Sequence, residues 1–569
     1  MVETKVCKLM VLISAGICLR ATVSLHSYSG QSKSPMFGDF EAQRHWQEVT
    51  VNLPVKDWYE NTSDNDLLYW GLDYPPLTAY HSWIVGHVGK MINESFVESH
   101  KSRGISTDQH KNFMRMTVIV ADVLVYIPAL LIACNVVIAK VLKMNIQKSE
   151  GFLFTFLALA ILYPGQILID NGHFQYNNIS LGLTVFAVVA ILLNRRLLGA
   201  AFFVLALNYK QMELYHAMPF FCYLLANCFV DPDEHKKFGF VKGIFRLASL
   251  GTVVVGIFAL LWLPWLGSLD SLLQVVHRIF PIYRGIFEDK VSNVWCIVNV
   301  FMKIKESFTN EEMAKVCLAC TVTAVLPSSM SLLFKPKKKK FLYALVNSSL
   351  AFFLFSFQVH EKSILIAAVP VILVFPMEPF MVFWFLQVST FSMFPLLIKD
   401  GLLGALISLS IVYFLMTKLL IDYSKGQKHE KKNFLSILWN IGKQSEGKFV
   451  ENLFISCFVL STIAEVLLVI GFLFVPAPEH LPFLHPLLIS AFSCCHFVMF
   501  FIYFNEVIDE SDGCGGKFNA VIVSEQFAGK SLLQRHRLVN TALLEELKVI
   551  HAFSQKTFTP EQWAVEQSQ

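Results

Sequence analysis

The chain has 569 residues, of which 54% are hydrophobic and 16% charged, and its mean hydropathy is +0.52. These values exclude a water-soluble protein whose surface has an ordinary charge density. A net charge of only +4, with the basic residues spread over short loops, gives no indication of a nucleic-acid partner. Most of the twelve cysteines fall inside apolar segments, so they predict no disulfide framework.

Apolar runs near 20 residues recur along most of the chain, and each is long enough to cross a hydrocarbon core about 30 Å thick. They predict an all-α polytopic membrane protein with about fourteen spans, some short enough to be tilted, broken or re-entrant. The expected spans are residues 7–25, 112–139, 151–169, 178–193, 197–208, 213–230, 245–268, 314–334, 341–358, 363–376, 379–397, 402–420, 451–475 and 486–505.

The first two predicted spans are separated by a loop of residues 26–110, which we call the first loop. Connections in helical proteins usually take two to eight residues, so a loop of this length indicates a function. Residues 36–81 mix ionisable groups with tryptophans and tyrosines, a composition suited to a polar site at a bilayer surface. We interpret the first loop as the catalytic lid of a membrane enzyme.

The distribution of basic residues tests this layout, because Lys and Arg collect in cytoplasmic loops. With the N-terminus in the cytosol, the inside loops hold 20 Lys and Arg residues, whereas the short outside loops hold only Lys210, Lys362 and Lys399. This alternation of inside and outside loops places the first loop, and a second long loop of residues 268–312, on the side of the membrane away from the cytosol. In an internal membrane of a eukaryotic cell, that side is a lumen. Both termini are then cytosolic.

Three short outside loops are compact polar clusters: residues 170–177, 208–213 and 360–363. The second long loop adds Arg278, Arg284, Glu288, Asp289 and Lys290. Ionisable side chains near a membrane surface are costly unless they find partners or face water, so such clusters favour a functional site. The alternative is that they are ordinary solvated helix ends.

Six strings in this order carry a specific resemblance: MFGDFEAQRHW, YWGLDYPPLTAYH, GHFQYN, NYKQMELYHA, FEDKVSNVWC and FQVHEKSIL. Over residues 8–505 the chain resembles the eukaryotic glucosyltransferases that extend the lipid-linked oligosaccharide in protein N-glycosylation, using dolichyl phosphate glucose as donor. The resemblance implies a helical glycosyltransferase of the lipid-donor (GT-C) class in the endoplasmic reticulum membrane. Its lumenal active site would lie under the first loop.

The resemblance also implies a reaction. The member that adds the first glucose transfers it to the nine-mannose dolichyl-diphosphate oligosaccharide in α-1,3 linkage, and the β-linked donor requires inversion in one displacement. In this family the aspartate of the Gly-Asp-Phe/Tyr-Glu string is the general base, and Asp39 matches it. One carboxylate is then enough, because dolichyl phosphate leaves without an acid. No cofactor is expected for the transfer.

Cations would stabilise the departing phosphate. His360 is our first candidate, because the resemblance places its His-Glu-Lys string close to the donor phosphate. The other candidate cations are His173, Lys210, Arg284 and Lys362. The remaining candidate substrate-binding residues are Glu41, Arg44, His45, Asp73, Gln175, Gln211, Glu288, Asp289 and Glu361.

Structural alternatives exist for three of these positions. Asp39 could instead be the N-cap of a surface helix over residues 40–49. His360 could cap a helix, and Asp73 could set the turn before two prolines. Asp39 and Glu41 also have the Asp-x-acid spacing of metal sites in other glycosyltransferases, but with no clear further ligand and no nucleotide diphosphate we do not expect a metal.

The polar tail of residues 506–569 departs from this pattern. Residues 518–523 predict a strand, residues 534–547 a helix, and Pro560 a helix start. Over residues 529–563 the tail resembles the BolA family, which pairs with monothiol glutaredoxins around a two-iron two-sulfur cluster. The matching ligands are Cys514 and His551.

The family's first helix is missing, so the α/β unit is incomplete. A joined gene prediction or read-through transcript and a two-function protein are the alternatives.

Three other functions were weighed against the first-glucose transferase. A sibling enzyme that adds the second glucose shares the architecture, and the acceptor it elongates distinguishes it. A transporter would show internal symmetry and ionisable residues near the membrane midplane, whereas the polar clusters here gather at one face. An iron-sulfur adaptor anchored by the helical part would leave the strings of the first loop unexplained.

Overall fold

The computed structural model describes residues 2–145, 149–230, 239–280, 291–424, 434–440, 448–510, 517–543 and 552–567. The chain forms two compact units, Met1–Asn505 and Glu506–Gln569.

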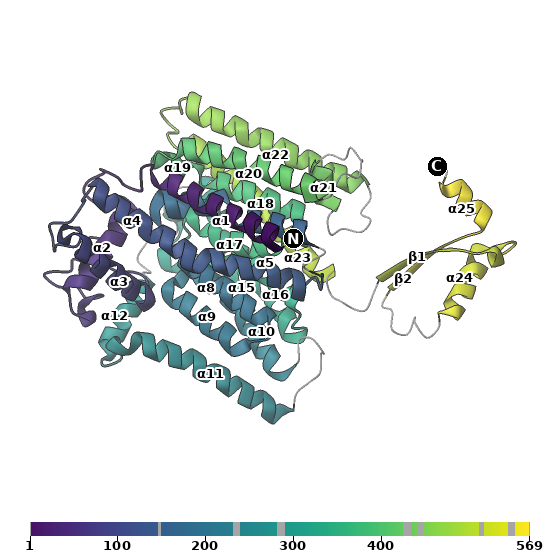
Figure 1. Cartoon of the computed structure of the whole chain (residues 1–569), viewed down its shortest axis with the longest axis horizontal. Helices are drawn as coiled ribbons and strands as arrows, with labels where there is room; N and C mark the ends of the chain where they lie inside the picture. The colour runs from purple at the N-terminus through teal and green to yellow at the C-terminus, as the bar shows by residue number, and fades with distance from the viewer. Residues whose placement is uncertain are drawn as a thin grey trace. The chain divides into compact units, whose positions relative to one another are not determined.

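The first unit is a helical bundle whose described residues include eight stretches long and apolar enough to cross a membrane (Figure 1). They are Lys5–Ser24, Asp108–Lys140, Glu150–Phe174, Phe240–Trp265, Asn310–Phe334, Leu403–Asp422, Lys448–Phe474 and Leu484–Asn505. Three apolar helices are shorter: α8 (Asn177–Leu192), α9 (Arg196–Tyr209) and α18 (Pro379–Ser392). The predicted all-α membrane fold is therefore confirmed.

The predicted number of about fourteen spans is not confirmed. Every predicted span coincides with helix, but several of these helices are too short to cross a bilayer as straight rods. Helix α17 (Ile364–Leu373), for example, has 10 residues, which at a rise of 1.5 Å per residue gives about 15 Å. Sequence windows detect apolar stretches of this kind but do not show where a helix starts and stops.

The helices that make up the long stretches are α1 (Val2–Ser24), α4 (Asp108–Ala121), α5 (Ile127–Lys140), α6 (Glu150–Ile161), α7 (Pro164–Ile167), α11 (Phe240–Trp262), α15 (Asn310–Phe334), α20 (Leu403–Ser424), α22 (Lys448–Phe474) and α23 (Leu484–Glu510). The remaining helices of this unit are α2 (Gly38–Asn52), α3 (Pro76–Ile92), α10 (Ala217–Phe229), α12 (Leu269–Ile279), α13 (Val294–Met302), α14 (Ile304–Ser307), α16 (Lys338–Phe355), α19 (Phe394–Lys399) and α21 (Phe434–Asn440). Two segments are π-helix, in which each backbone hydrogen bond joins residues five positions apart. They are η3 (Asp122–Tyr126) and η4 (Leu168–Phe174).

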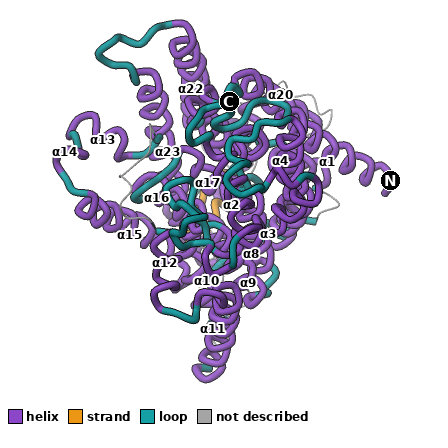
Figure 2. Tube along the Cα trace, turned by 90° about the vertical axis from the view of Figure 1, so that its left-hand side faces the viewer, coloured by secondary structure: helices purple, strands orange, loops and turns teal. Residues whose placement is uncertain are grey.

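The first loop folds into a small domain at one end of the bundle, where α2 and α3 lie together with α12 (Figures 1 and 2). Its core is aromatic: Trp46, Trp58 and Tyr59 are buried with Trp265, which follows α11. The indole of Trp58 packs 6.2 Å from that of Trp265, centre to centre. This cluster fixes the first loop against the end of a membrane helix, so the loop is a structured lid.

Helix α2 is buried on all sides from Phe40 to Thr50, which differs from the surface helix that the sequence offered as an alternative over residues 40–49. Its charged residues are compatible with burial because Arg44 pairs with both Glu41 and Glu48. The fully buried guanidinium of Arg44 lies 2.6 Å from a carboxylate oxygen of Glu41 and 2.6 Å from one of Glu48. Because an unpaired buried charge costs several kcal/mol, this paired triad gives α2 one orientation in the lid.

Buried charges inside the bundle fix the π-helix η4. Arg20 of α1 lies 3.2 Å from the carboxylate of Asp122, which also accepts a hydrogen bond of 2.9 Å from Asn171 of η4. Arg115 of α4 donates to the carbonyl of Asn171 at 2.6 Å and to that of Ser27 at 3.1 Å. In a low-dielectric bundle such bonds have no water to replace them, so η4 is held from two sides.

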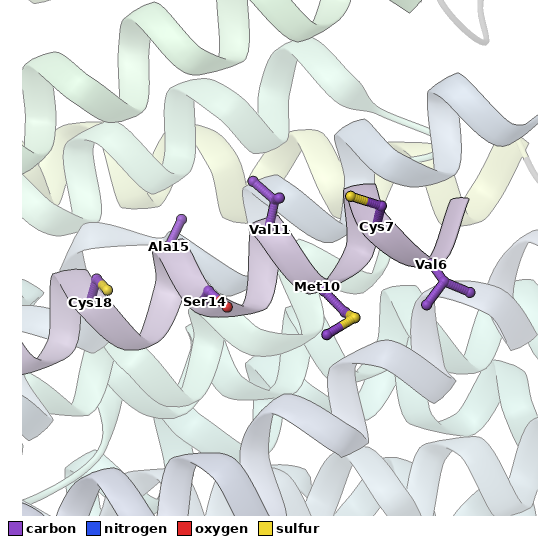
Figure 3. Close-up of a pocket in the computed structure, with 7 residues that line it drawn as sticks. All are labelled: Val6, Cys7, Met10, Val11, Ser14, Ala15 and Cys18. Atoms are coloured by element: carbon purple, nitrogen blue, oxygen red, sulfur yellow. The ribbon is translucent and has the colours of Figure 1, made fainter. Parts of the chain in front are cut away.

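Helix α1 also shows how the outside of the bundle is built. A shallow hollow runs along it, lined by Val6, Cys7, Met10, Val11, Ser14, Ala15 and Cys18 (Figure 3). All of these side chains come from one helix and most are apolar, and Met10 and Val11 are each 63% exposed. The hollow is therefore a strip of outward-facing helix surface, suited to contact with lipid tails.

The second unit contains a parallel pair of strands, β1 (Lys517–Val523) and β2 (Ala552–Phe558), with helices α24 (Leu532–Ala542) and α25 (Pro560–Gln567). Strand β1 and the start of α25 lie where the sequence predicts them, and α24 covers the first part of the predicted helix of residues 534–547, of which residues 544–547 lie outside the described residues. Strand β2 was not predicted, because its alternation is weak and polar residues occupy its centre. Cys514 and His551 lie outside the described residues.

Candidate active site

Asp39 occupies the first turn of α2, and a close approach of two chain segments sets its position. Gly38 has φ +71°, and a Cβ atom there would lie 2.7 Å from the carbonyl group of Ser29. The preceding Phe37 also lies in the left-handed region, with φ 58°. Gly38 therefore lets the chain turn sharply enough to bring Asp39 beside the residues that follow α1.

Asp39 is not the N-cap of this helix. The cap position belongs to Phe37, and the Asp39 side chain points instead to three donors that come from distant segments. Its Oδ2 atom accepts a hydrogen bond of 2.6 Å from Gln175 Nε2, lies 3.0 Å from Nε2 of His173 and forms an ion pair with Lys362. Three elements that lie up to 323 positions apart thus converge on one oxygen.

The remaining oxygen of this carboxylate is available. Within the described part of the chain Oδ1 of Asp39 has no hydrogen-bond partner, and the side chain is 24% exposed. Burial on its own would raise the pKa of Asp39, but the Lys362 ammonium and the His173 ring hold that pKa well below its usual range. Asp39 is therefore an ionised carboxylate with one oxygen fixed and one oxygen open.

His173 stands between two carboxylates. Its Nε2 faces Asp39, and its Nδ1 lies 2.5 Å from Oδ2 of Asp400, the residue after α19. The side chains of His173 and Asp400 are each only 3% exposed. A backbone bond of 3.1 Å from Ser29 N to the carbonyl of His173 ties this end of η4 to the start of the first loop.

Lys210 is a second lysine near this site. Its ammonium donates to Asn177 Oδ1 at 2.5 Å and lies 5.1 Å from the ring centre of Tyr74. Burial, followed by repulsion from Lys362, lowers the pKa of Lys210 to about 8. Lys210 and Lys362 repel each other, and a bound anion would relieve that repulsion. The two lysines beside the open oxygen of Asp39 therefore favour an anion-binding site.

Several other predicted substrate-binding residues make contacts that hold the folded first loop in place. Gln211 donates to the backbone carbonyls of Asp73 and Ile279, at 3.1 and 3.3 Å, and so links three loops. Glu41, Arg44 and His45 lie in the buried charge network of α2, where His45 Nδ1 is 3.4 Å from Glu48. Whether they also touch a substrate stays a prediction.

The His-Glu-Lys string lies at η7 (Glu361–Ser363), and all of its side chains are partly exposed. His360 is at the N-cap position but makes no capping bond with its side chain. It is Lys362, two residues further on, that contacts Asp39. Arg284, Glu288 and Asp289 lie outside the described residues.

Sequence reasoning missed Asp400 as a member of the site, and it placed Asn177 in the polar cluster of residues 170–177 without naming it a substrate-binding residue. Lys399 was recognised as an outside-loop residue, so its neighbour Asp400 could have been found by asking which acids share a loop with that lysine. Across the described ranges, no group of three or more His, Cys, Asp or Glu side chains is placed to hold a metal ion.

The fold and this site together define a polytopic membrane protein in which a buried charged cluster joins the folded first loop to one end of the helical bundle. Comparison with known proteins then identifies the family. Residues 12–503 match the ALG6, ALG8 glycosyltransferase family, and the chain belongs to it. Residues 504–562 match the BolA-like protein family. Both predicted resemblances, and the assignment as a glycosyltransferase, are thereby confirmed.

Relatives also match most of the chain. A Drosophila melanogaster protein named "Probable dolichyl pyrophosphate Man9GlcNAc2 alpha-1,3-glucosyltransferase" is 49% identical over 86% of this chain and 96% of its own length. A Mus musculus protein named "Dolichyl pyrophosphate Man9GlcNAc2 alpha-1,3-glucosyltransferase" is 46% identical over 88% of this chain and 96% of its own. An Arabidopsis thaliana protein with the same name as the first is 40% identical over 86% and 87%.

The turn before Asp39 gives a first testable expectation. In Gly38→Ala, the added Cβ meets the Ser29 carbonyl and the left-handed φ is strained, so the carboxylate shifts. We expect glycosyltransferase activity to fall by about 100-fold, the cost of a misplacement near 1 Å. Gly256→Ala is the matched control, since nothing lies within 4 Å of a Cβ added there. Equal activity of the two purified variants would contradict the role given to this turn.

Proposed function

We propose that this chain transfers one glucosyl group from dolichyl phosphate glucose to the nine-mannose dolichyl-diphosphate oligosaccharide, forming an α-1,3 linkage. The names of the relatives support the acceptor and the linkage, since they include dolichyl pyrophosphate, Man9GlcNAc2 and alpha-1,3-glucosyltransferase. The reaction adds the first glucose of the N-glycosylation precursor. The observation that carries the proposal is the Asp39 carboxylate, with Oδ2 held by three donors and Oδ1 open.

The proposed mechanism is a single displacement at the anomeric carbon of glucose. Oδ1 of Asp39 takes the proton of the mannose 3-hydroxyl while that oxygen forms a bond to the anomeric carbon. The bond from this carbon to the phosphate oxygen breaks, its electron pair leaves with dolichyl phosphate, and the configuration inverts. Asp39 then loses the proton to water. Because the leaving phosphate is already an anion of low basicity, no general acid is required.

Lys362 and Lys210 are the cations that we assign to the donor phosphate. Both belong to the polar end of the bundle, and Lys362 already lies beside the carboxylate that must reach the acceptor. Charge develops on the phosphate as the bond to glucose breaks, so fixed ammonium groups there lower the barrier. Gln175 and His173 keep Asp39 in place if Lys362 moves toward the donor.

We place this reaction on the lumenal side of the endoplasmic reticulum membrane, with both termini in the cytosol. Support comes from the basic residues, of which 20 lie in the loops assigned to the cytosol and three in the short loops of the opposite face. The first loop, which carries Asp39, belongs to that opposite face. The partners of the reaction are two dolichol-linked lipids that both reside in the bilayer.

The choice of acceptor tests this function against that of the sibling enzyme. Purified full-length protein is given dolichyl phosphate glucose with either the nine-mannose acceptor or the same acceptor already carrying one glucose. We expect elongation of the first acceptor only. Elongation of the monoglucosylated acceptor alone would assign the chain to the second glucose, and failure with both would refute glucosyl transfer.

For the BolA-like unit we propose an iron-sulfur partnership with a monothiol glutaredoxin, with Cys514 and His551 as the cluster ligands of this chain. The family match supports it. Both residues lie outside the described part of the structure, so no step of the transfer is assigned to them. The test is the iron content and visible absorption of the complex with a monothiol glutaredoxin, which should be lost in Cys514→Ala with His551→Ala; an unchanged spectrum would refute it.

A further inference from the structure

The strongest feature that the proposed mechanism leaves unused is Asp400. Its carboxylate sits behind His173, on the side away from Asp39, at 2.5 Å from Nδ1. Asp400 does not touch Asp39 and is only 3% exposed, so a substrate has no direct access to it. It lies 361 positions from Asp39 in the sequence, and nothing in a local motif connects the two residues.

We propose that Asp400 is a positioning residue that keeps His173 doubly protonated, so that Nε2–H always donates to Oδ2 of Asp39 and leaves Oδ1 for the acceptor hydroxyl. The inference rests on the proposed function, since it assigns a role within the same reaction. It adds a residue that acts through another one rather than on the substrate.

The geometry requires two protons on the ring. A neutral imidazole has one donor nitrogen and one acceptor nitrogen, so one of the two facing carboxylates would meet a lone pair. Only the imidazolium donates on both sides, at 3.0 Å to Asp39 and 2.5 Å to Asp400. Asp400 thereby also fixes the plane of the ring and the direction of its Nε2–H bond.

Charged groups face His173 and its partners from several elements. Asp39 from α2, Asp400 beyond α19 and Lys362 from η7 face the ring or its partner, and Arg115 of α4 interacts electrostatically with Asp400. Asp170, on the same π-helix as His173, is turned to other partners: Gln166, Asn177 and the backbone of Asn178. The two carboxylates offset the imidazolium and the Lys362 ammonium, and Arg115 adds one further positive charge beside Asp400.

The backbone around Asp400 is held independently of its carboxylate. Ser27, next to the first span, donates its hydroxyl to the backbone carbonyl of Asp400. The following Gly401 has φ +74°, and a Cβ there would lie 2.7 Å from Oγ of Ser27. This arrangement offers a matched control, because Ser27→Ala loosens the same backbone while leaving the carboxylate in place.

The test compares Asp400→Asn, Asp400→Glu and Ser27→Ala in the full-length protein, with kcat and KM for each lipid measured from about pH 6 to pH 8. We expect kcat of Asp400→Asn to fall by about 10-fold to 100-fold, the range for carboxylates that orient a histidine from behind. The KM values should not change, because Asp400 does not reach the substrate. Asp400→Glu should recover most of the rate.

The pH profile separates positioning from a structural role. Without Asp400 the His173 ring keeps one carboxylate partner, Asp39, instead of two, so it should lose its second proton at a lower pH than in the wild type. The activity of Asp400→Asn should therefore decline as the pH rises through this range. The wild type and Ser27→Ala should keep one shared profile. A normal kcat in Asp400→Asn, or a loss equal at every pH and matched by Ser27→Ala, would overturn the inference. Failure of the proposed function itself would give a different result: either Asp39→Asn would be fully active, or the wild type would transfer no glucose.

Discussion

Asp39→Asn should reduce glucose transfer by about 1,000-fold or more, within the range of a general base removed from its reaction. The amide is nearly the same size as the carboxylate, so Gln175 and His173 still have an oxygen to bond. What is lost is the acceptor of the hydroxyl proton and the negative charge beside Lys362. The measurement is initial rate of purified protein with saturating donor and acceptor.

A matched variant controls for the change of charge in the first loop. Asp66→Asn makes the same substitution at an exposed position, where the carboxylate only accepts from the backbone of Leu68. Its activity should stay near that of the wild type. Both variants should elute as monodisperse protein and unfold at comparable temperatures. If Asp39→Asn retained activity within a few fold of Asp66→Asn, Asp39 would not be the base.

Lys362→Met should reduce the rate by about 100-fold to 1,000-fold, the effect of removing one preorganised group that stabilises developing charge. The methionine keeps much of the volume of the lysine stem and removes the ammonium. Lys56→Met, an exposed lysine of the first loop, is the control and should have little effect. A normal rate in Lys362→Met would mean that another cation serves the phosphate.

The same variant should change the pH dependence in a defined direction. Lys362 is the main group that lowers the pKa of Asp39, so the wild-type base stays ionised far into the acid range. Activity that needs ionised Asp39 is present above this pKa and is lost as the pH falls through it. Removing Lys362 raises the pKa, and the acid limb of kcat should therefore move to higher pH. An acid limb that stays in place or moves lower would contradict the ion pair.

Much of the architecture could be read from the sequence because its causes are local. Apolar runs near 20 residues indicate membrane helices, and the excess length of residues 26–110 indicates the lid. Asp39 could be located because it stands in a Gly-Asp-Phe-Glu string that the resemblance identifies, whereas the turn at Gly38 was found only in the structure. The clusters at residues 170–177 and 360–363 contain His173, Gln175 and Lys362, which the structure brings to Asp39.

The rest depends on long-range packing, which no local pattern records. Arg44 has the sequence environment of a surface ligand, but α2 turns it inward between Glu41 and Glu48. Asp400 joins the site only because α19 ends beside η4, far from the first loop in the chain. The number of crossings is not confirmed for a related reason, since Pro164 and the π-helix η4 interrupt or reshape helices within apolar windows.

The configuration of the glucose in the product tests the one-carboxylate mechanism most directly. The full-length protein is incubated with β-linked dolichyl phosphate glucose and the nine-mannose acceptor, and the new linkage is determined by NMR and linkage-specific glucosidases. Our account predicts an α-1,3-linked glucose, because one displacement at the anomeric carbon inverts it. A β-linked product would require two displacements and a second nucleophile, and would contradict a mechanism that rests on Asp39 alone.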